Sequence, residues 1–136
     1  MRRTLTCLLI AAGLIALISG CASEPTPPPD TVTIRDVKSS AIPNSEYTRY
    51  NVKVAYLLRS VPRAVVTLGF DLEEPGRYIV MNEREVGEGI GEVDVSADVR
   101  LPKRDTVTLY ADLSRLHHPS QWTSLAQASR ELTITK

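Results

Sequence analysis

This chain of 136 residues has few of the residue types from which disulfide, metal and catalytic sites are built. It contains two cysteines and two histidines, and aromatic residues make up 5% of it. The hydrolase pattern G-x-S-x-G and the zinc-protease pattern H-E-x-x-H are both missing. We therefore predict that the protein is not an enzyme and that it binds neither a cofactor nor a metal ion.

An excess of charge of one sign is also missing. The chain carries 16 Lys and Arg against 16 Asp and Glu, and its formal net charge is zero. Loss of the first 20 residues would remove Arg2 and Arg3 and leave a slight acidic excess. Nucleic-acid-binding proteins need a basic patch to displace counterions from the phosphates, so the composition argues against a nucleic-acid partner.

Only one apolar run is long, and it is too short to span a membrane. Leu5 to Ile18 follows Arg2 and Arg3 and ends at Ser19-Gly20-Cys21. A helix of this length does not cross ~30 Å of hydrocarbon, whereas the positive start and the small-residue end are typical of a signal peptide. The alternatives are a plain secretory signal whose cleavage site happens to precede a cysteine, and a transmembrane helix.

The end of this run, Ile18-Ser19-Gly20-Cys21, resembles the lipobox of bacterial lipoproteins: an aliphatic residue, two small residues and a cysteine. The resemblance implies a diacylglycerol thioether on Cys21, cleavage of residues 1–20 and acylation of the new amino group. Two or more acyl chains anchor a protein stably in a membrane. Ala22 stands where Asp would mark inner-membrane retention, which implies the outer membrane, facing the periplasm. The mature chain would then have no free thiol and no disulfide, since Cys7 leaves with the signal peptide.

Residues 21–30 form a proline-rich tether behind the predicted lipid. Ala22 to Asp30 holds four prolines in nine residues. Proline favours the extended polyproline II conformation, at ~3.1 Å per residue, so this segment reaches up to roughly 28 Å. We interpret it as a semi-rigid stalk; a proline-rich ligand for a partner domain is the alternative.

From residue 31 to 136 the apolar residues recur at every second position, which is typical of half-buried β-strands. The breakers between the apolar segments are 43–45, 60–62, 74–76, 87–89 and 101–103, each containing Pro or Gly. Only residues 122–128 could form one helical turn. The alternation predicts seven short strands, near residues 31–37, 50–58, 64–70, 78–81, 93–99, 107–113 and 132–134.

Seven short strands with regular turns predict one all-β domain, a seven-stranded antiparallel β-sandwich. Four stretches resemble a pattern of bacterial immunoglobulin-like domains: Val54–Leu58, Ala64–Phe70 with its "LGF", Val86–Val93 with its "VxxGxG", and Val107–Ser114. The resemblance covers most of residues 48–125 and implies an immunoglobulin-like or fibronectin III-like fold, with no fixed activity. A transthyretin-like sandwich is the alternative.

An acidic cluster spans residues 83–98. Glu92, Asp94 and Asp98 would stand in a row on one strand face, too far apart to converge on calcium without help. We expect them to form a solvated face paired with Arg and Lys of neighbouring strands. Calcium or a basic partner is the alternative.

The candidate binding residues lie in or next to the stretch 114–130, which we expect to be irregular. Trp122 is expected to plug one end of the sandwich or, if exposed, to anchor a partner or a sugar ring. Tyr110, His117 and His118 could join it. The two histidines have no third ligand nearby to complete a zinc site, so we expect an exposed loop there.

Together these features predict an outer-membrane lipoprotein with a non-catalytic role, as a protein-interaction or assembly-accessory module with an envelope protein as partner. Small sandwich lipoproteins that pilot secretion-system components belong to this class. One mechanism would be strand addition at a sheet edge, at Thr31–Val37 or Glu131–Lys136. The alternative is a ligand- or glycan-binding lipoprotein.

Overall fold

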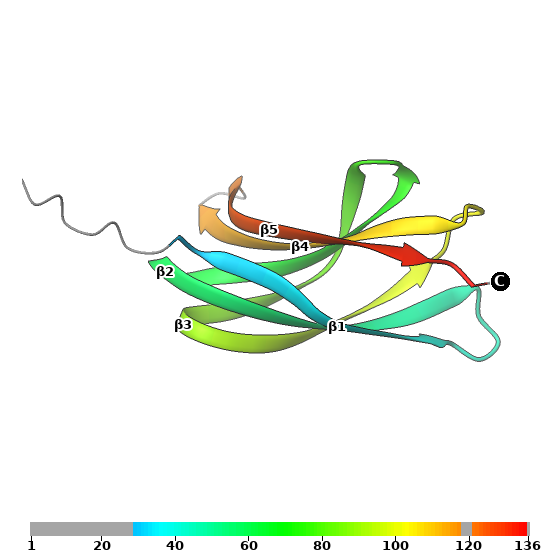
Figure 1. Ribbon diagram of the computed structural model, residues 1–136, viewed down its shortest axis with the longest axis horizontal. Coiled ribbons are helices and arrows are strands. Elements are labelled where there is room, and N and C mark those ends of the chain that lie inside the picture. The colour runs from blue at the N-terminus through cyan, green and yellow to red at the C-terminus, as the bar shows by residue number, and fades with distance from the viewer. Residues whose placement is uncertain (1–28, 118–120, 136) are drawn as a thin grey trace, which may run out of the picture.

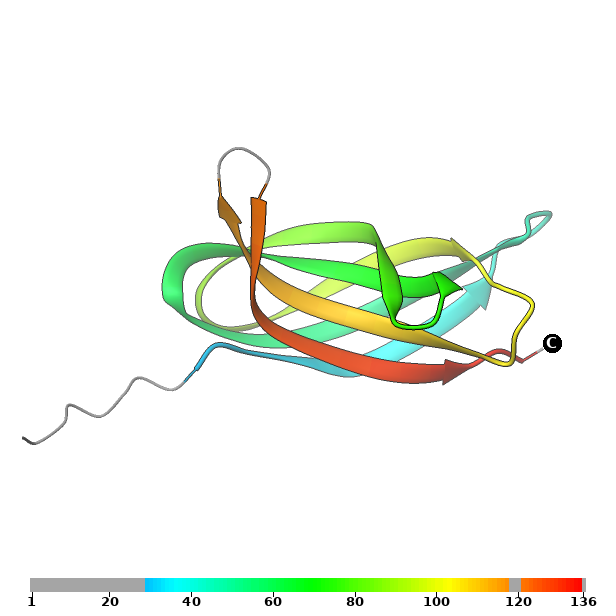
Figure 2. The same ribbon diagram turned by 90° about the horizontal axis from the view of Figure 1, so that it is seen from above.

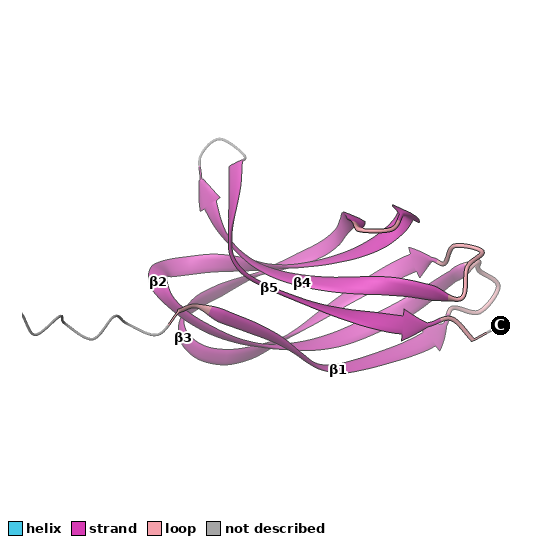
Figure 3. Ribbon diagram, turned by 45° about the horizontal axis from the view of Figure 1, so that its top comes forward, coloured by secondary structure: helices cyan, strands magenta, loops and turns pink. Residues whose placement is uncertain are grey.

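The computed structural model describes residues 29–117 and 121–135, and these residues form an antiparallel all-β fold (Figures 1 and 3). No helix that could span a membrane occurs among the described residues. The strands are β1 (Thr31–Ala41), β2 (Tyr47–Glu74), β3 (Arg77–Arg100), β4 (Thr106–His117) and β5 (Gln121–Thr133).

The sheet curls on itself because β2 and β3 are long and bend together. Residues 47–58 of β2 pair with β1 on one side and with residues 89–100 of β3 on the other. We call these segments the three-stranded layer. Beyond the bend, residues 63–74 of β2 pair with residues 77–87 of β3 and with β4, which in turn pairs with β5. These segments form the four-stranded layer.

The sequence predicted seven short strands, whereas the described residues form five. The segments expected at 50–58 and 64–70 are parts of β2, and those at 78–81 and 93–99 are parts of β3. The expected breakers 60–62 and 87–89 lie at the bend instead of ending the strands. The β2–β3 register shifts between Leu58 and Arg63, so Pro62 interrupts no regular ladder, and Gly89 takes a φ of 113° there.

The helical turn considered for residues 122–128 is also wrong. This stretch belongs to β5, which pairs with β4 along its length. The alternating residues Ser124, Ala126 and Ala128 are small, so they give a weak period-two signal.

The other three breakers do separate strands. Asn44 has a φ of 57°, and the Ser45 hydroxyl accepts a hydrogen bond from the Tyr47 amide at 3.1 Å. Pro75-Gly76 joins β2 to β3 with a φ of 84° at Gly76, as a type II turn requires. Residues 101–105 connect β3 to β4 across the two layers.

The core lies between the two layers and is built from the predicted alternating residues, which confirms that part of the analysis. Each fully buried Leu or Phe stabilises the fold by ~1.5–3 kcal/mol relative to an exposed one. The fully buried side chains are Val52, Val54, Leu58, Val66, Leu68, Phe70, Val95, Val99, Val107, Leu109 and Leu113.

One stretch departs from alternation. Every residue from Ala64 to Asp71 in β2 is buried, including Thr67 and Asp71, which point away from the core. Side chains from neighbouring strands of the same layer therefore shield part of its outer face from solvent. The candidate site lies on this face.

Candidate functional site

Asp112 of β4 occupies the centre of this outer face and is 3% exposed. Its Oδ2 accepts hydrogen bonds from the Ser124 hydroxyl at 2.8 Å and from Gln127 Nε2 at 3.2 Å, both on β5. Its Oδ1 accepts a hydrogen bond from the Ser114 hydroxyl. All three donors are neutral, so they hold the carboxylate in place without neutralising its charge.

Two tyrosines cover the face beside this carboxylate. Tyr78 of β3 and Tyr110 of β4 stack with ring centroids 4.9 Å apart and an interplanar angle of 27°. Gly69 of β2 lies beneath them, and a Cβ added there would come within 2.5 Å of the Tyr78 ring. The missing side chain at residue 69 is therefore what lets the Tyr78 ring lie on the sheet.

A cavity of about 180 Å³ opens over Thr67, next to these tyrosines. Its walls are Thr67, Tyr78, Val80 and Ser114. Thr67 and Ser114 are each 5% exposed, whereas Val80 is 50% exposed at the rim. The cavity is therefore floored by hydroxyl groups and bordered by apolar surface.

Negative charge flanks the floor of this cavity. Thr67 pairs in register with Glu83 of β3 on one side and with Asp112 of β4 on the other, and residues opposite one another share a face of the sheet. Burial raises the pKa of the Tyr78 phenol, and the Asp112 charge raises it further. The field of the carboxylate therefore reaches the cavity wall.

A second buried carboxylate lies at the other end of the same face. Asp71 of β2 is 4% exposed and accepts hydrogen bonds from the Thr108 amide at 2.6 Å and from Arg104 Nη2 at 2.8 Å. Arg104 belongs to the β3–β4 connection. Asp71 is therefore neutralised by a cation and fastens that connection to the layer.

The structure brings only one of the sequence-predicted binding residues into this site. Tyr110 contributes its ring to the tyrosine stack. His117 ends β4 and Trp122 lies in β5, paired with Leu116, but their side chains are outside the description. Cys21 and His118 lie outside the described residues altogether.

The other residues of the site were missed by the sequence analysis. Tyr78 lies in the short strand predicted at 78–81, Asp112 lies in the strand predicted at 107–113, and Ser114 begins the stretch predicted to be irregular. The available signal was the alternating row Tyr110, Asp112 and Ser114, which places an aromatic ring, a carboxylate and a hydroxyl on one face of β4.

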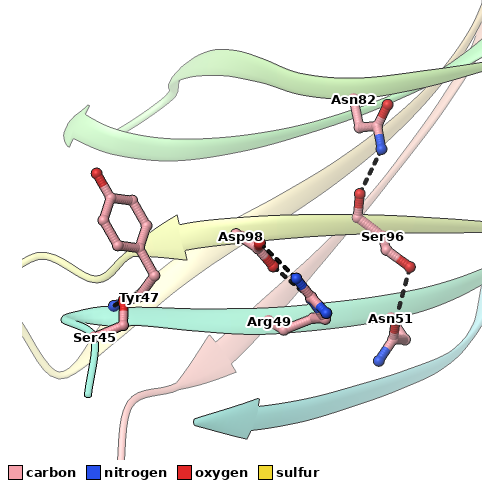
Figure 4. A network of polar contacts seen from close by, with 7 residues as sticks. All are labelled: Ser45, Tyr47, Arg49, Asn51, Asn82, Ser96 and Asp98. Atoms are coloured by element: carbon pink, nitrogen blue, oxygen red, sulfur yellow. Dashed lines mark hydrogen bonds and ion pairs between the residues drawn. The ribbon is translucent and has the colours of Figure 1, made fainter. Parts of the chain in front are cut away.

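The expected pairing of the acidic cluster is seen at two positions. Asp98 accepts hydrogen bonds from Arg49 at 2.7 and 2.8 Å (Figure 4). Glu85 accepts one from Arg63 at 3.2 Å. A cavity of about 480 Å³ adjoins the first pair, but there the guanidinium and the carboxylate neutralise each other. Within residues 29–117 and 121–135, no group of three or more His, Cys, Asp or Glu could hold a metal ion.

The free edges of the two layers differ in how they are protected against pairing with another strand. On β3, charged residues are frequent, and Asn82 Nδ2 donates to the Ser96 carbonyl at 2.6 Å (Figure 4). On β1, the register shifts between Ile34 and Asp36, and three charged residues surround the shift. On β5, a bulge at Leu125 shifts the register, yet residues 121–129 carry no charge.

No protein-family model matches this chain, and neither does any curated protein.

Proposed function

We propose that this protein is a lipoprotein of the bacterial outer membrane, anchored through Cys21 after removal of residues 1–20. Its β-domain acts, in this proposal, as a non-catalytic protein-interaction or assembly-accessory module facing the periplasm. The observation that carries the interaction role is the uncharged edge of β5, residues 121–129.

The pairing pattern supports an immunoglobulin-like, fibronectin III-like sandwich. If β2 and β3 are each divided at the bend, the first, second and fifth of seven segments pair together. The third, fourth, sixth and seventh form the other layer. In immunoglobulin domains the third, sixth and seventh strands share a sheet, and in the variable type strand C′ joins that sheet. The fourth segment here, residues 77–87, occupies the place of C′.

An unpaired strand edge attracts extended peptide segments because its amides and carbonyls lack strand partners on one side. Natural proteins protect such edges with charges, bulges or covering side chains. β5 has only Arg130 and Glu131 as charged residues, both near its C-terminal end. Thr123, Gln127 and Ser129 are exposed, and their modest size would let a partner strand approach. Strand addition at β5 would use these free backbone groups.

The position of the tether supports an orientation for this edge. The Asp30 carboxylate accepts hydrogen bonds from the Arg59 amide at 2.6 Å and the Ser60 amide at 3.1 Å. These bonds fasten the end of the proline-rich segment to the bend of β2. β5 begins at the same end of the molecule and runs away from it (Figures 1 and 2). A lipid at Cys21 would thus set this bend, together with the beginning of β5, toward the bilayer.

The interaction role is tested by crosslinking in cells. A photoreactive residue placed at Ser129 should capture one envelope protein, whereas the same residue at Thr33, exposed on β1, should not. Ser129→Lys should abolish the capture by adding a charge to the edge, and Thr33→Lys should leave capture from position 129 intact. Equal capture at both positions, or capture insensitive to Ser129→Lys, would contradict pairing at β5.

The anchor is tested separately. Cys21→Ala should release the protein from the membrane fraction and remove the added lipid mass. Ala22→Asp should move the lipidated protein to the inner membrane. A Cys21→Ala protein that stays in the membrane fraction would contradict the lipid anchor, and an unmoved Ala22→Asp protein would contradict the sorting.

A further inference from the structure

We propose that the cavity over Thr67 is a binding site for an alkylammonium group, such as the end of a lysine side chain. The site lies on the outer face of the four-stranded layer and does not depend on the lipid anchor or on pairing at β5. Three properties of the cavity support this chemistry: the direction of its hydrogen-bonding groups, its charge and its size.

The hydroxyl group in the cavity wall is oriented to accept a hydrogen bond. Ser114 donates its hydrogen to Asp112, so the lone pairs of its oxygen are left for a neighbour in the cavity. Ser114 and Thr67 are both almost fully buried, so water reaches them only through the cavity. A ligand group that donates a hydrogen bond therefore fits the Ser114 oxygen.

The surrounding charge selects a cation among possible donors. Asp112 borders the floor on one side with three neutral donors around it, and Glu83 borders it on the other. Arg63, farther along the same face, is engaged by Glu85 at 3.2 Å. The Tyr78 ring forms one wall, and a cation against an aromatic ring is stabilised by the charge distribution of the ring.

The size of the cavity selects a thin ligand. A volume of about 180 Å³ lies below the ~300 Å³ at which drug-sized ligand pockets begin, so a single side chain or a small amine fits. Val80, half-exposed at the rim, and the Tyr78 ring provide apolar surface for a methylene stem. An ammonium group on a short alkyl chain satisfies the wall, the floor and the rim together.

The test is an NMR titration of the full chain in detergent micelles with n-butylammonium chloride. The amide signals of Thr67, Val80 and Ser114 should shift and saturate, with a dissociation constant in the millimolar range for so small a ligand. The matched neutral probe is 1-butanol, which has the same stem and no charge. Equal shifts with butanol, or no saturable shift with butylammonium, would overturn the proposal.

Two variants test the charges. Asp112→Asn should weaken butylammonium binding about tenfold, because the buried negative charge next to the cavity is lost. Glu83→Gln, at an exposed position that cannot disturb folding, should weaken it about threefold through the loss of a screened charge. The control Asp94→Asn makes the same change of charge on the outer face of the other layer and should leave binding intact. If Glu83→Gln and Asp112→Asn both bind as the unmodified protein does, the cavity does not recognise a cation.

A final arm distinguishes the source of the ammonium group. A peptide with one central lysine, compared with the same peptide carrying norleucine, tests a protein side chain as ligand. Putrescine tests a free amine. Tighter binding of the lysine peptide than of putrescine assigns the site to a partner protein, and the reverse order assigns it to a soluble amine. If the norleucine peptide binds as tightly as the lysine peptide and putrescine does not bind, the proposal fails.

Discussion

The outer faces of the two layers both carry charged side chains, which include an exposed ion pair on one layer and buried carboxylates on the other. On the three-stranded layer, Arg49 and Asp98 form an ion pair at 2.7 Å, with about half of each side chain exposed. On the four-stranded layer, Asp71 and Asp112 are 4% and 3% exposed. The difference arises because the stacked rings of Tyr78 and Tyr110 cover part of the second layer, whereas most outward side chains of the first layer are exposed.

This contrast separates charges that affect stability from charges that do not. An exposed ion pair gains little, because water solvates both partners well when they are apart. A buried carboxylate has lost its water and depends on each remaining hydrogen bond. Asp71 forms an ion pair with Arg104, whereas Asp112 accepts hydrogen bonds from neutral donors. We therefore expect substitutions in the four-stranded layer to have larger effects than matched ones in the three-stranded layer.

The largest effect is expected when the buried cation is removed. Arg104→Leu leaves the Asp71 carboxylate buried with the Thr108 amide as its remaining donor. Because an unpaired buried charge is costly, the free energy of unfolding should fall by about 3 kcal/mol. Urea denaturation measures this value. The matched variant, Arg49→Leu, removes the cation of the exposed pair and should lower the urea midpoint only slightly; equal losses would contradict the contrast between the layers.

A smaller loss is expected at the second carboxylate. Asp112→Ala removes the acceptor of three hydrogen bonds, but Ser124 and Gln127 lie at exposed positions and recover water. The free energy of unfolding should therefore fall by about 2 kcal/mol.

The milder variant Asp112→Asn provides a readout of the charge itself. Burial and the Asp112 charge together hold the pKa of Tyr78 above its ordinary value of 10.0. Removing the charge should bring that pKa down, as followed by ultraviolet titration of the phenols. A Tyr78 pKa that does not move would show that the carboxylate has no electrostatic effect at the cavity.

The fold class and the core were accessible from the sequence because alternation reports on one buried face at a time. Val52, Val54 and Val95 were identified in this way, and so were the turns at Asn44 and Gly76. The bend was not accessible. Pro62 and Gly89 give the same local signal whether a strand ends or turns into a second layer, and only pairing with a neighbouring strand distinguishes the two.

The candidate site was beyond the sequence analysis for a related reason. Alternation assigns Thr67, Asp112 and Ser114 to the side of the strand opposite the core, and that side is usually solvated. They are buried because Tyr78, which comes from β3 and stacks on Tyr110 of β4, covers the face next to them. A ring contributed by another strand leaves no signal in the residues that it covers.

The next prediction compares the two glycines that lie under tyrosine rings. A Cβ at Gly69 would come within 2.5 Å of the Tyr78 ring and 3.2 Å of the Ile79 carbonyl oxygen, so the covering ring would have to move. A Cβ at Gly91 in the other layer meets Tyr56, closest at its hydroxyl end, which can swing away. Gly69→Ala should therefore lower the free energy of unfolding by about 1–2 kcal/mol and Gly91→Ala by less than about 1 kcal/mol.

Thermal unfolding of both glycine variants measures these losses. Gly69→Ala should cost less stability in a protein that already carries Tyr78→Ala than in the unmodified protein, because the ring with which the new methyl group clashes is gone. If the two glycine variants are equally stable, the Tyr78 ring on the four-stranded layer yields as readily as the Tyr56 ring, which packs against the core on the inner side of the other layer.

The smallest effect is expected from acid titration of the exposed pair. The hydrogen bond from Arg49, with its charge, holds the pKa of Asp98 below the ordinary value of 3.8. The folded state therefore binds the proton less readily than the unfolded state. The stabilisation by this pair is complete above the unfolded pKa and is lost as the pH falls through the lower folded pKa. NMR titration of the Asp98 carboxyl should show this low pKa, and Arg49→Ala should return it toward 3.8. Because both side chains are solvated, the same variant should lower the urea midpoint at pH 7 only slightly, and a large drop there would place this pair with the buried carboxylates of the four-stranded layer.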